Sequence, residues 1–352
     1  MSSSQPKKSA LPIQSSTEFA RYVGLARTTV SRVLNGQPGL KKKTIERVQR
    51  AIEETGFVPN AYALHLKGKR TATVGICMEN LLTPPVVRKL AALQHLLREK
   101  NYASLIEVVE PGSSDKVIRH FLSMRVEAVV FIGHFDEEQL TRQVGELNTR
   151  ATPHLVIDHV GIKGANTVSL DRISAMTALV KHLTGLGHRS FGILAFNSPA
   201  RSVTDRLRGI REALAAEGLE FNQCASAIDG AFPRVNDFEE GRRIARAFVG
   251  RGQVPTAFIA VNDEVAIGAM HGLQEAGLRV PDDVSVVGFN NQDLCLMPTP
   301  ALTSVDQCIE ETIKVAGEVL LPQLGEPPRP RPIIRMIEPL LVVRGSTGSA
   351  RA

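Results

Sequence analysis

The sequence predicts two fold classes in one chain: a small all-α head at the N-terminus and a larger α/β body of doubly wound parallel sheets. Residues 15–56 show short helical patterns separated by glycine stops. From residue 71 onward, apolar runs alternate with helical segments, as they do in parallel sheets. The chain has 352 residues, enough for two or three compact domains.

Charge is divided unevenly along the chain. Residues 1–70 hold 13 Lys and Arg against 4 Asp and Glu, whereas the whole chain holds 42 against 36. A basic head on a slightly acidic body indicates a polyanionic partner, and nucleic acid is favoured over a membrane. A basic surface that is merely solvated is the alternative.

The remaining composition is typical of a globular protein of the reducing cytoplasm. The four cysteines lie far apart and lack metal-ligand spacing. No apolar run approaches the roughly 18 residues of a membrane span, and residues 1–13 lack the apolar segment of a signal peptide. We therefore expect a cytoplasmic protein without membrane association and with a disordered basic tail over 1–13.

The first predicted helix of the head opens at a capping box. Ser15 can accept a hydrogen bond from the backbone N–H of Glu18, whose side chain can reach back to Ser15. Phe19 and Val23 then share one helical face. Gly24 ends the helix, because the turn that follows needs a residue free to adopt a positive φ.

The second predicted helix, over 27–34, carries a polar and cationic outer face. Arg27 and Arg32 can each donate two hydrogen bonds to guanine O6 and N7, and Thr28 can contact a base edge or a thymine methyl group. Such a face is typical of helices that enter the major groove. An αα-hairpin with a solvated face is the alternative. The side chains suited to phosphate oxygens are Thr29, Ser31 and Asn35.

A third predicted helix spans 42–55 and ends at Gly56. Three consecutive lysines, 41–43, stand at its N-terminus, where the helix dipole disfavours cations. They are better placed opposite phosphates, although a solvated charge run is the alternative.

The head motifs resemble those of the lactose-repressor/galactose-repressor family of bacterial transcription regulators. The resemblance implies a helix-turn-helix head over 14–58, followed over 59–70 by a hinge helix and linker that fold on operator DNA. Asn60 would begin that hinge helix, and Leu66 would wedge into the minor groove and bend the duplex. The motifs are Thr29-Val30-Ser31-Arg32-Val33-Leu34-Asn35, Thr44, Gly56-Phe57-Val58-Pro59-Asn60 and Ala63 with Leu66. The DNA contacts we expect are Ser16, Thr17, Arg27, Thr28, Thr29, Ser31, Arg32, Asn35, Asn60 and Leu66.

Three positions of the head depart from the family pattern. Ala26 and Lys41 stand where the family usually has a serine that caps the second and the third helix. A missing cap costs about 0.5–2 kcal/mol, so we expect a head of low intrinsic stability. Leu64 stands where the family often has arginine, which puts one polar contact of the hinge in question.

The body shows about ten predicted strands, which fit two doubly wound sheets better than one. The predicted strands are 74–78, 103–109, 128–132, 154–158, 167–170, 191–195, 257–261, 284–289, 302–305 and 333–337. The predicted helices are 86–100, 116–124, 173–186, 205–217, 239–251, 263–276 and 306–324.

The resemblance implies that the body, residues 71–352, is periplasmic-binding-protein-like, with two lobes joined by three crossings. Ligands of such folds bind between the lobes, at the carboxyl ends of the strands. We place the crossings near 160–166, 291–301 and 325–332, and the prolines within the last two stretches are typical of linkers. The first lobe would then hold about 71–161 and 302–324, and the second about 165–290 and 332–345.

Matches to family motifs predict that several residues line this cleft. Arg206, in an Arg-x-x-Gly motif, suits ligand oxygens, with an ion pair as the alternative. Asp263 contributes to the cleft or its support, or else caps a helix. Phe232 is the best aromatic candidate, since the chain has no Trp and residues 83–86 lack the aromatic of the family. The effector contacts we expect are Asp158, Arg206, Phe232, Asp263 and Asn290.

Asn290 is a departure that weakens a simple sugar assignment. The family commonly has an aspartate at this position, and its carboxylate accepts hydrogen bonds from sugar hydroxyls. The neutral amide of Asn290 offers one acceptor and two donor hydrogens instead.

The sequence contains none of the common motifs for nucleotide binding, metalloprotease or esterase chemistry. We therefore expect no catalytic site, no metal and no cofactor. The patterns together predict a homodimeric DNA-binding regulator, most simply a repressor, that is switched by a small polar ligand such as a sugar or a related metabolite. Two alternatives are a DNA-binding regulator controlled by a partner protein and, more distantly, a solute-binding transport component.

Overall fold

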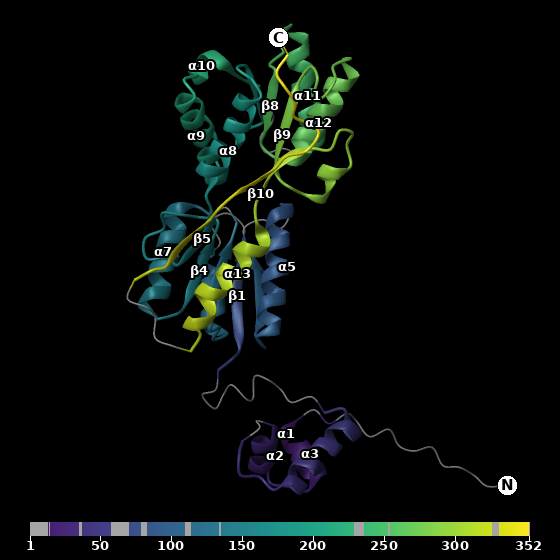
Figure 1. The fold of residues 1–352 in the computed structure, drawn as a ribbon. Helices are drawn as coiled ribbons and strands as arrows, with labels where there is room; N and C mark the ends of the chain where they lie inside the picture. Colours follow the sequence, from purple (N-terminus) through teal and green to yellow (C-terminus); the bar gives the residue numbers. More distant parts are fainter. Residues whose placement is uncertain are drawn as a thin grey trace, which may run out of the picture. The chain divides into compact units, whose positions relative to one another are not determined.

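The computed structural model describes most of the chain, which divides into two units, Met1–Thr71 and Ala72–Ala352 (Figure 1). We call them the head and the body. The predicted tail over 1–13 and hinge over 59–70 lie almost entirely outside the described residues, so they stay predictions. The described residues are 13, 15–34, 37–57, 70–78, 83–109, 114–133, 135–228, 236–252, 254–325 and 331–351.

Three helices form the described head, as the sequence predicts: α1 (Ser16–Val23), α2 (Arg27–Leu34) and α3 (Lys42–Thr55). Apolar side chains from all three helices meet in one small core. Within it, the rings of Phe19 and Phe57 stack with their centroids 4.2 Å apart. This packing fixes α2 with one face turned away from the core.

Local chemistry explains the ends of these helices. Ser15 and Glu18 form the predicted capping box, in which the Glu18 N–H donates to Ser15 Oγ at 3.2 Å. Gly24 ends α1 at a φ of 66°, in the left-handed region that favours glycine. Lys41 precedes α3 without a side-chain cap hydrogen bond, and Ala26 precedes α2 without a side chain that could make one.

Two six-stranded sheets form the body, with the strand orders β11-β5-β4-β3-β1-β2 and β12-β10-β9-β8-β6-β7. β12 runs antiparallel to β10, and the other described pairs are parallel. The strands of the first sheet are β1 (Thr73–Met78), β2 (Ala103–Val108), β3 (Ala128–Ile132), β4 (His154–Ile157), β5 (Thr167–Leu170) and β11 (Ile334–Ile337). Those of the second sheet are β6 (Phe191–Leu194), β7 (Ala225–Ile228), β8 (Ala257–Ala260), β9 (Ser285–Asn290), β10 (Thr303–Asp306) and β12 (Leu340–Val342).

Helices cover both sheets, and each sheet together with its helices forms one lobe of the body (Figure 1). Successive residues of a central strand face opposite cores: Ile76 of β1 belongs to one apolar cluster and Cys77 to another. The helices of the first lobe are α5 (Pro84–Glu99), α6 (Ser114–Ser123), α7 (Glu137–Thr149), α13 (Ile309–Leu320) and the short η2 (Leu321–Gln323). Those of the second lobe are α8 (Arg172–Gly185), α9 (Arg201–Ala216), α10 (Phe221–Cys224), α11 (Asp237–Gly250), α12 (Asp263–Glu275) and the short η1 (Asp293–Leu296).

The strand order corrects the predicted lobe boundaries. β5 and β11 pair with each other in the first sheet, although both were expected in the second lobe. β10 lies in the second sheet beside β9, although it was expected in the first lobe. The chain therefore crosses between β5 and α8, between β10 and α13, and between β11 and β12. Proline clusters mark loops, but they do not determine which sheet the next strand joins.

Several elements escaped the sequence prediction. α7 is rich in polar residues and has a weak apolar pattern, but it is capped by Asp136, which accepts from the Gln139 N–H at 2.8 Å. The strands β7 and β12 were also missed; they are the two edge strands of the second sheet, and at most one residue of each is buried. α9 begins at Arg201 rather than at 205. α13 begins at Ile309 rather than at 306, because Asp306 is the last residue of β10.

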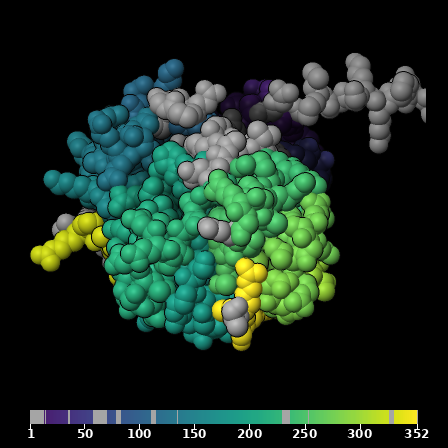
Figure 2. Space-filling view, turned by 90° about the horizontal axis from the view of Figure 1, so that it is seen from above, coloured from purple at the N-terminus to yellow at the C-terminus, as the bar shows by residue number. Residues whose placement is uncertain are grey.

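The C-terminal residues close the second lobe. Figure 2 shows this segment, in yellow, at the surface of the lobe, and the Ala350 N–H donates to the Leu186 carbonyl at 2.8 Å. Within the described residues, every helix is too short or too polar to span a membrane.

Candidate functional site

The outer face of α2 presents the predicted base-reading side chains. Arg27, Thr28 and Arg32 are exposed, whereas Val30 of the same helix is buried in the core of the head. A guanidinium Nη of Arg32 lies 3.4 Å from the Pro38 carbonyl, a long and weak hydrogen bond that leaves Arg32 at the surface. This face could contact base edges in a groove.

The other predicted DNA contacts of the head surround this face. Thr17 is exposed in the first turn of α1, and the other described contacts are partly buried. The lysines 41–43 are exposed at the start of α3, as are Arg47 and Arg50 further along it. The partly buried contacts are Ser16, Thr29 and Ser31. The predicted contacts that lie outside the described residues are Asn35, Asn60 and Leu66.

A cavity of about 920 Å³ lies between the two lobes of the body. It opens where strands of both sheets end, as expected for a doubly wound fold. Of the five predicted effector contacts, Asp158, Arg206 and Asn290 line this cavity. Further lining residues come from the first turns of α5 and α9, from the ends of β8 and β9, and from the crossing between β10 and α13.

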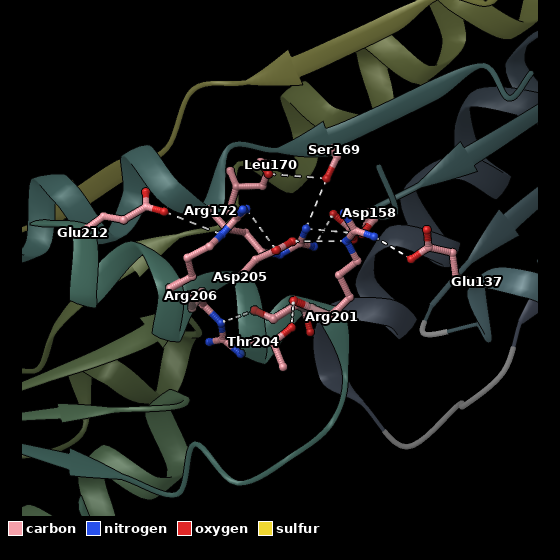
Figure 3. Close-up of polar contacts among 12 residues, drawn as sticks. Glu137, Asp158, Ser169, Leu170, Arg172, Arg201, Thr204, Asp205, Arg206 and Glu212 are labelled. Atoms are coloured by element: carbon pink, nitrogen blue, oxygen red, sulfur yellow. Dashed lines mark hydrogen bonds and ion pairs between the residues drawn. The ribbon is translucent and has the colours of Figure 1, made fainter. Parts of the chain in front are cut away.

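Asp158 lies between two buried cations on the cavity wall. It follows β4 with a φ of 71°, and it pairs with Lys89 of α5. It also pairs with Arg172, whose Nη2 lies 3.1 Å from Asp158 Oδ1 (Figure 3). Lys89 is 2% exposed and Arg172 is 7% exposed. Burial lowers the pKa of Lys89, and the Asp158 carboxylate opposes that effect. Neither cation was expected at the cleft.

Sequence reasoning could have detected Lys89. It follows Pro85 and Val86 and precedes Leu93 and Leu97 on the buried face of α5. A lysine at a core position of an amphipathic helix is rare unless it has a partner, so its position is a signal for a buried polar site.

Hydrogen bonds link Lys89 to Asn290 across the cavity wall. The Lys89 ammonium donates to Gln307 Oε1 at 2.7 Å, and Gln307 Nε2 donates to Asn290 Oδ1 at 2.6 Å. Gln307 lies in the crossing between the lobes, and Asn290 ends β9 of the second lobe. The chain of bonds therefore joins the two lobes.

Arg206 lies on the second-lobe wall and is 6% exposed. Its side chain donates to the carbonyl oxygens of Ser202 and Val261, at 2.8 and 2.5 Å. The guanidinium also lies over the ring of Phe289, 4.2 Å from the centroid. These contacts hold a positive charge at the surface of the cavity.

Asp263 does not line the cavity. It is fully buried behind Gly288, where Ser304 Oγ donates to its carboxylate at 2.5 Å and the Gln292 N–H donates at 2.9 Å. Burial raises the pKa of Asp263 to about 6. Its hydrogen bonds tie the loop after β9 to α12, so it supports the wall that carries Asn290.

An ion pair bridges the lobes at the cavity. Arg201, at the start of α9, lies 2.6 Å from Glu137, at the start of α7, and both line the cavity (Figure 3). The sequence prediction missed this pair because α7 itself was missed. Phe232 lies outside the described residues, and within the described residues no cluster of three His, Cys, Asp or Glu side chains could hold a metal ion.

Two family models match separate parts of the chain, one in the head and one in the body. The family description "Bacterial regulatory proteins, lacI family" matches residues 17–60, and "Periplasmic binding protein-like domain" matches residues 180–347. Catabolite control protein A of Staphylococcus xylosus is 27% identical over 313 residues, which cover 88% of this chain and 92% of that protein. An HTH-type transcriptional regulator of Streptomyces lividans, reg1, is 28% identical over 342 residues, covering 95% and 96%.

Solved structures show the same architecture. The lac repressor dimer bound to operator and the anti-inducer ONPF is 24% identical, with a TM-score of 0.83, over 94% of this chain and 98% of that chain. The complex of the transcriptional regulator CelR with cellobiose is 26% identical, with a TM-score of 0.66, over 95% and 100%. A helical head and two parallel α/β lobes are therefore a shared fold.

Proposed function

Because the chain belongs to the LacI family of DNA-binding transcription regulators, a family without enzymatic activity, we propose that it is a repressor that binds a near-palindromic operator as a homodimer and answers to a small polar ligand. Such a protein acts on chromosomal DNA in the cytoplasm. The proposal has a DNA part and a ligand part, which rest on different regions of the chain.

The exposed face of α2 carries the DNA part. Arg27, Thr28 and Arg32 project from a helix that the core of the head holds in place, a geometry suited to base edges in the major groove. Cations on the neighbouring α3 would contact phosphates and position the head. In a dimer, two heads would read two half-sites, with the hinge segments carrying Asn60 and Leu66 between them.

The inter-lobe cavity carries the ligand part. Its walls belong to both lobes, so a molecule that contacts both would favour one lobe angle over another. The lobe angle would in turn determine whether the two hinges of the dimer can meet on DNA. The ligand then changes operator affinity, and the operator changes ligand affinity by the same factor. The solved structure of CelR is a complex with cellobiose, which supports a small hydroxylated ligand here.

The DNA part is tested by selecting genomic fragments with the full-length protein and measuring affinity by fluorescence anisotropy. We expect a near-palindromic site bound at least about 1,000-fold more tightly than random DNA at physiological salt. The affinity should fall steeply with salt, because phosphate contacts release counterions. Equal affinity for the selected site and for random DNA would reject a sequence-specific regulator.

A further inference from the structure

A chain of hydrogen bonds fixes how the Asn290 amide is turned. An ammonium group can only donate, so the Lys89 ammonium requires the amide oxygen of Gln307. The NH₂ group of Gln307 then donates to the amide oxygen of Asn290. The oxygen of Asn290 is thereby engaged, and its NH₂ group is what it can offer to a molecule in the cavity. The wall at this position donates hydrogen bonds, whereas the aspartate common in the family accepts them.

Lys89 adds a second donor to the same wall. Its ammonium has three N–H groups, and the structure shows two acceptors, Asp158 and Gln307. The third N–H can serve a ligand, since Lys89 lines the cavity. Lys89 of the first lobe and Asn290 of the second lobe therefore both bring donor groups to the cavity wall, and Gln307 links them.

The buried charges of the cavity wall are mainly positive. Lys89, Arg172 and Arg206 are each at most 7% exposed, and Asp158 lies between the first two. The other carboxylates of the lining are exposed or only partly buried. Among them, Glu137 pairs with Arg201, and Glu264 accepts from Gln292 at 2.8 Å. The buried cations thus outnumber the one carboxylate that lies between them, and the wall beside them favours a negative charge.

We propose that the cleft binds a polyol that carries an oxyanion, a sugar acid or a sugar phosphate, and that Lys89 and Asn290 hold the oxyanion. This inference rests on the proposed function, because it concerns the same ligand site. A carboxylate or phosphate only accepts hydrogen bonds, so it matches a wall that donates. A hydroxyl of a neutral sugar can also accept from these donors, but it carries no negative charge to pair with the buried cations of the wall.

The experiment measures ligand binding to the full-length protein by titration calorimetry at constant ionic strength. The probes are D-gluconate, D-glucuronate, D-galacturonate and glucose 6-phosphate, each compared with neutral D-glucose or D-galactose, and acetate and inorganic phosphate serve as simple anions. We expect at least one anionic polyol to bind ten times or more as tightly as its neutral counterpart and as the simple anions. Carboxylate and phosphate probes distinguish the two sources of the oxyanion.

Three variants locate the binding. Asn290→Asp places a carboxylate beside the position of the oxyanion, so it should weaken binding of the anionic probe roughly 10- to 100-fold. Lys89→Met removes the ammonium at similar volume and should have an effect of similar size. Arg88→Met is the control, because Arg88 directly precedes Lys89 in α5, is exposed and pairs with Glu310 outside the cavity. If Lys89→Met fails to fold, binding by Asn290→Asp alone tests the proposal.

The same preparation is assayed for operator binding, which separates this inference from the proposed function. If the operator is bound but a neutral sugar binds as tightly as its acid, or no anionic probe binds, the inference is overturned and the regulator remains. Unchanged binding in Asn290→Asp also overturns it. Loss of specific DNA binding by the wild-type protein would instead reject the proposed function.

Discussion

The head and the cleft both use cationic side chains, but they place them in opposite surroundings. Arg27 and Arg32 are exposed on α2 and are available to a partner in water. Lys89 and Arg172 are buried and depend on Asp158 between them. An exposed charge costs little and gains from a polyanion, whereas a buried charge is tolerated only with a partner. The comparison predicts that loss of one charge affects recognition in the head and stability in the cleft.

Asp158→Asn should have the largest effect. It leaves Lys89 and Arg172 buried without a carboxylate, and breaking a buried pair costs about 3–5 kcal/mol. We expect a loss of this size in the free energy of unfolding of the body, measured by urea denaturation. The double variant with Lys89→Met should recover part of the loss, because it removes one of the two cations.

Glu310→Gln is the exposed counterpart of this change. Glu310 pairs with Arg88 at 3.5 Å, and its side chain is 79% exposed. Its removal should cost less than about 1 kcal/mol, as for other surface pairs. Equal costs for the two variants would contradict the division between exposed and buried charges.

The second prediction concerns Asp263, whose pKa is raised to about 6 by burial. A raised folded-state pKa means that the contribution of Asp263 to stability is full below its unfolded pKa, near 3.8, and is lost as the pH rises through 6. Between pH 4 and 7 the wild type should therefore lose about 2 kcal/mol relative to Asp263→Asn.

The difference between the two proteins is the quantity to measure, by urea denaturation at several pH values. Burial lowers the pKa of four of the described histidines, so their protonation makes the folded protein less stable as the pH falls. This effect runs opposite to that of Asp263. These histidines are present in both proteins, so their contribution cancels. Parallel pH profiles would mean that the Asp263 carboxyl group is not desolvated. The histidines are His154, His159, His182 and His188.

Local signals predicted the head and the strand pattern well. The capping box of Ser15 and Glu18 marks the start of α1, and Gly24 marks its end. The helices α1, α2 and α3 all lie where the sequence predicts them. Asp158 was expected at the cleft because it ends a predicted strand, whereas Arg206 and Asn290 were expected there because they occupy positions of family motifs. Such positions depend on short-range order along the chain.

The pairing of strands that lie far apart in the chain could not be predicted from the sequence. Which sheet receives β5, β10 and β11 depends on contacts between strands that are far apart in the chain. The same holds for Lys89, whose partners Asp158 and Gln307 come from distant segments. Asp263 was assigned to the cleft because it follows β8, but its side chain turns inward behind Gly288, where no Cβ stands in the way.

Arg32→Ala tests the exposed half of the comparison. Arg32 would contact a base edge, so its loss should weaken operator binding by about 1–3 kcal/mol and relax the preference at one base pair. The stability of the body should not change, because Arg32 lies in the head. Anisotropy with the operator, with operators altered at single positions and with random DNA gives the three affinities. An equal loss on random DNA would assign Arg32 to phosphates instead of bases.

The smallest effect is expected at the ion pair between Arg201 and Glu137. This pair bridges the two lobes, as the cleft residues do. Its side chains are nevertheless 36% and 55% exposed, as those of the head are exposed. An exposed pair is worth roughly 0.2–1 kcal/mol and is screened by salt. Glu137→Gln should therefore shift the lobes modestly towards separation, measured as the distance between spin labels on α7 and α9. Glu138→Gln is the matched control, because Glu138 pairs with Arg142 within α7. The shift should disappear at high salt, where the wild type already behaves like the variant. A shift that persists at high salt would mean that Glu137 acts through packing and not through charge.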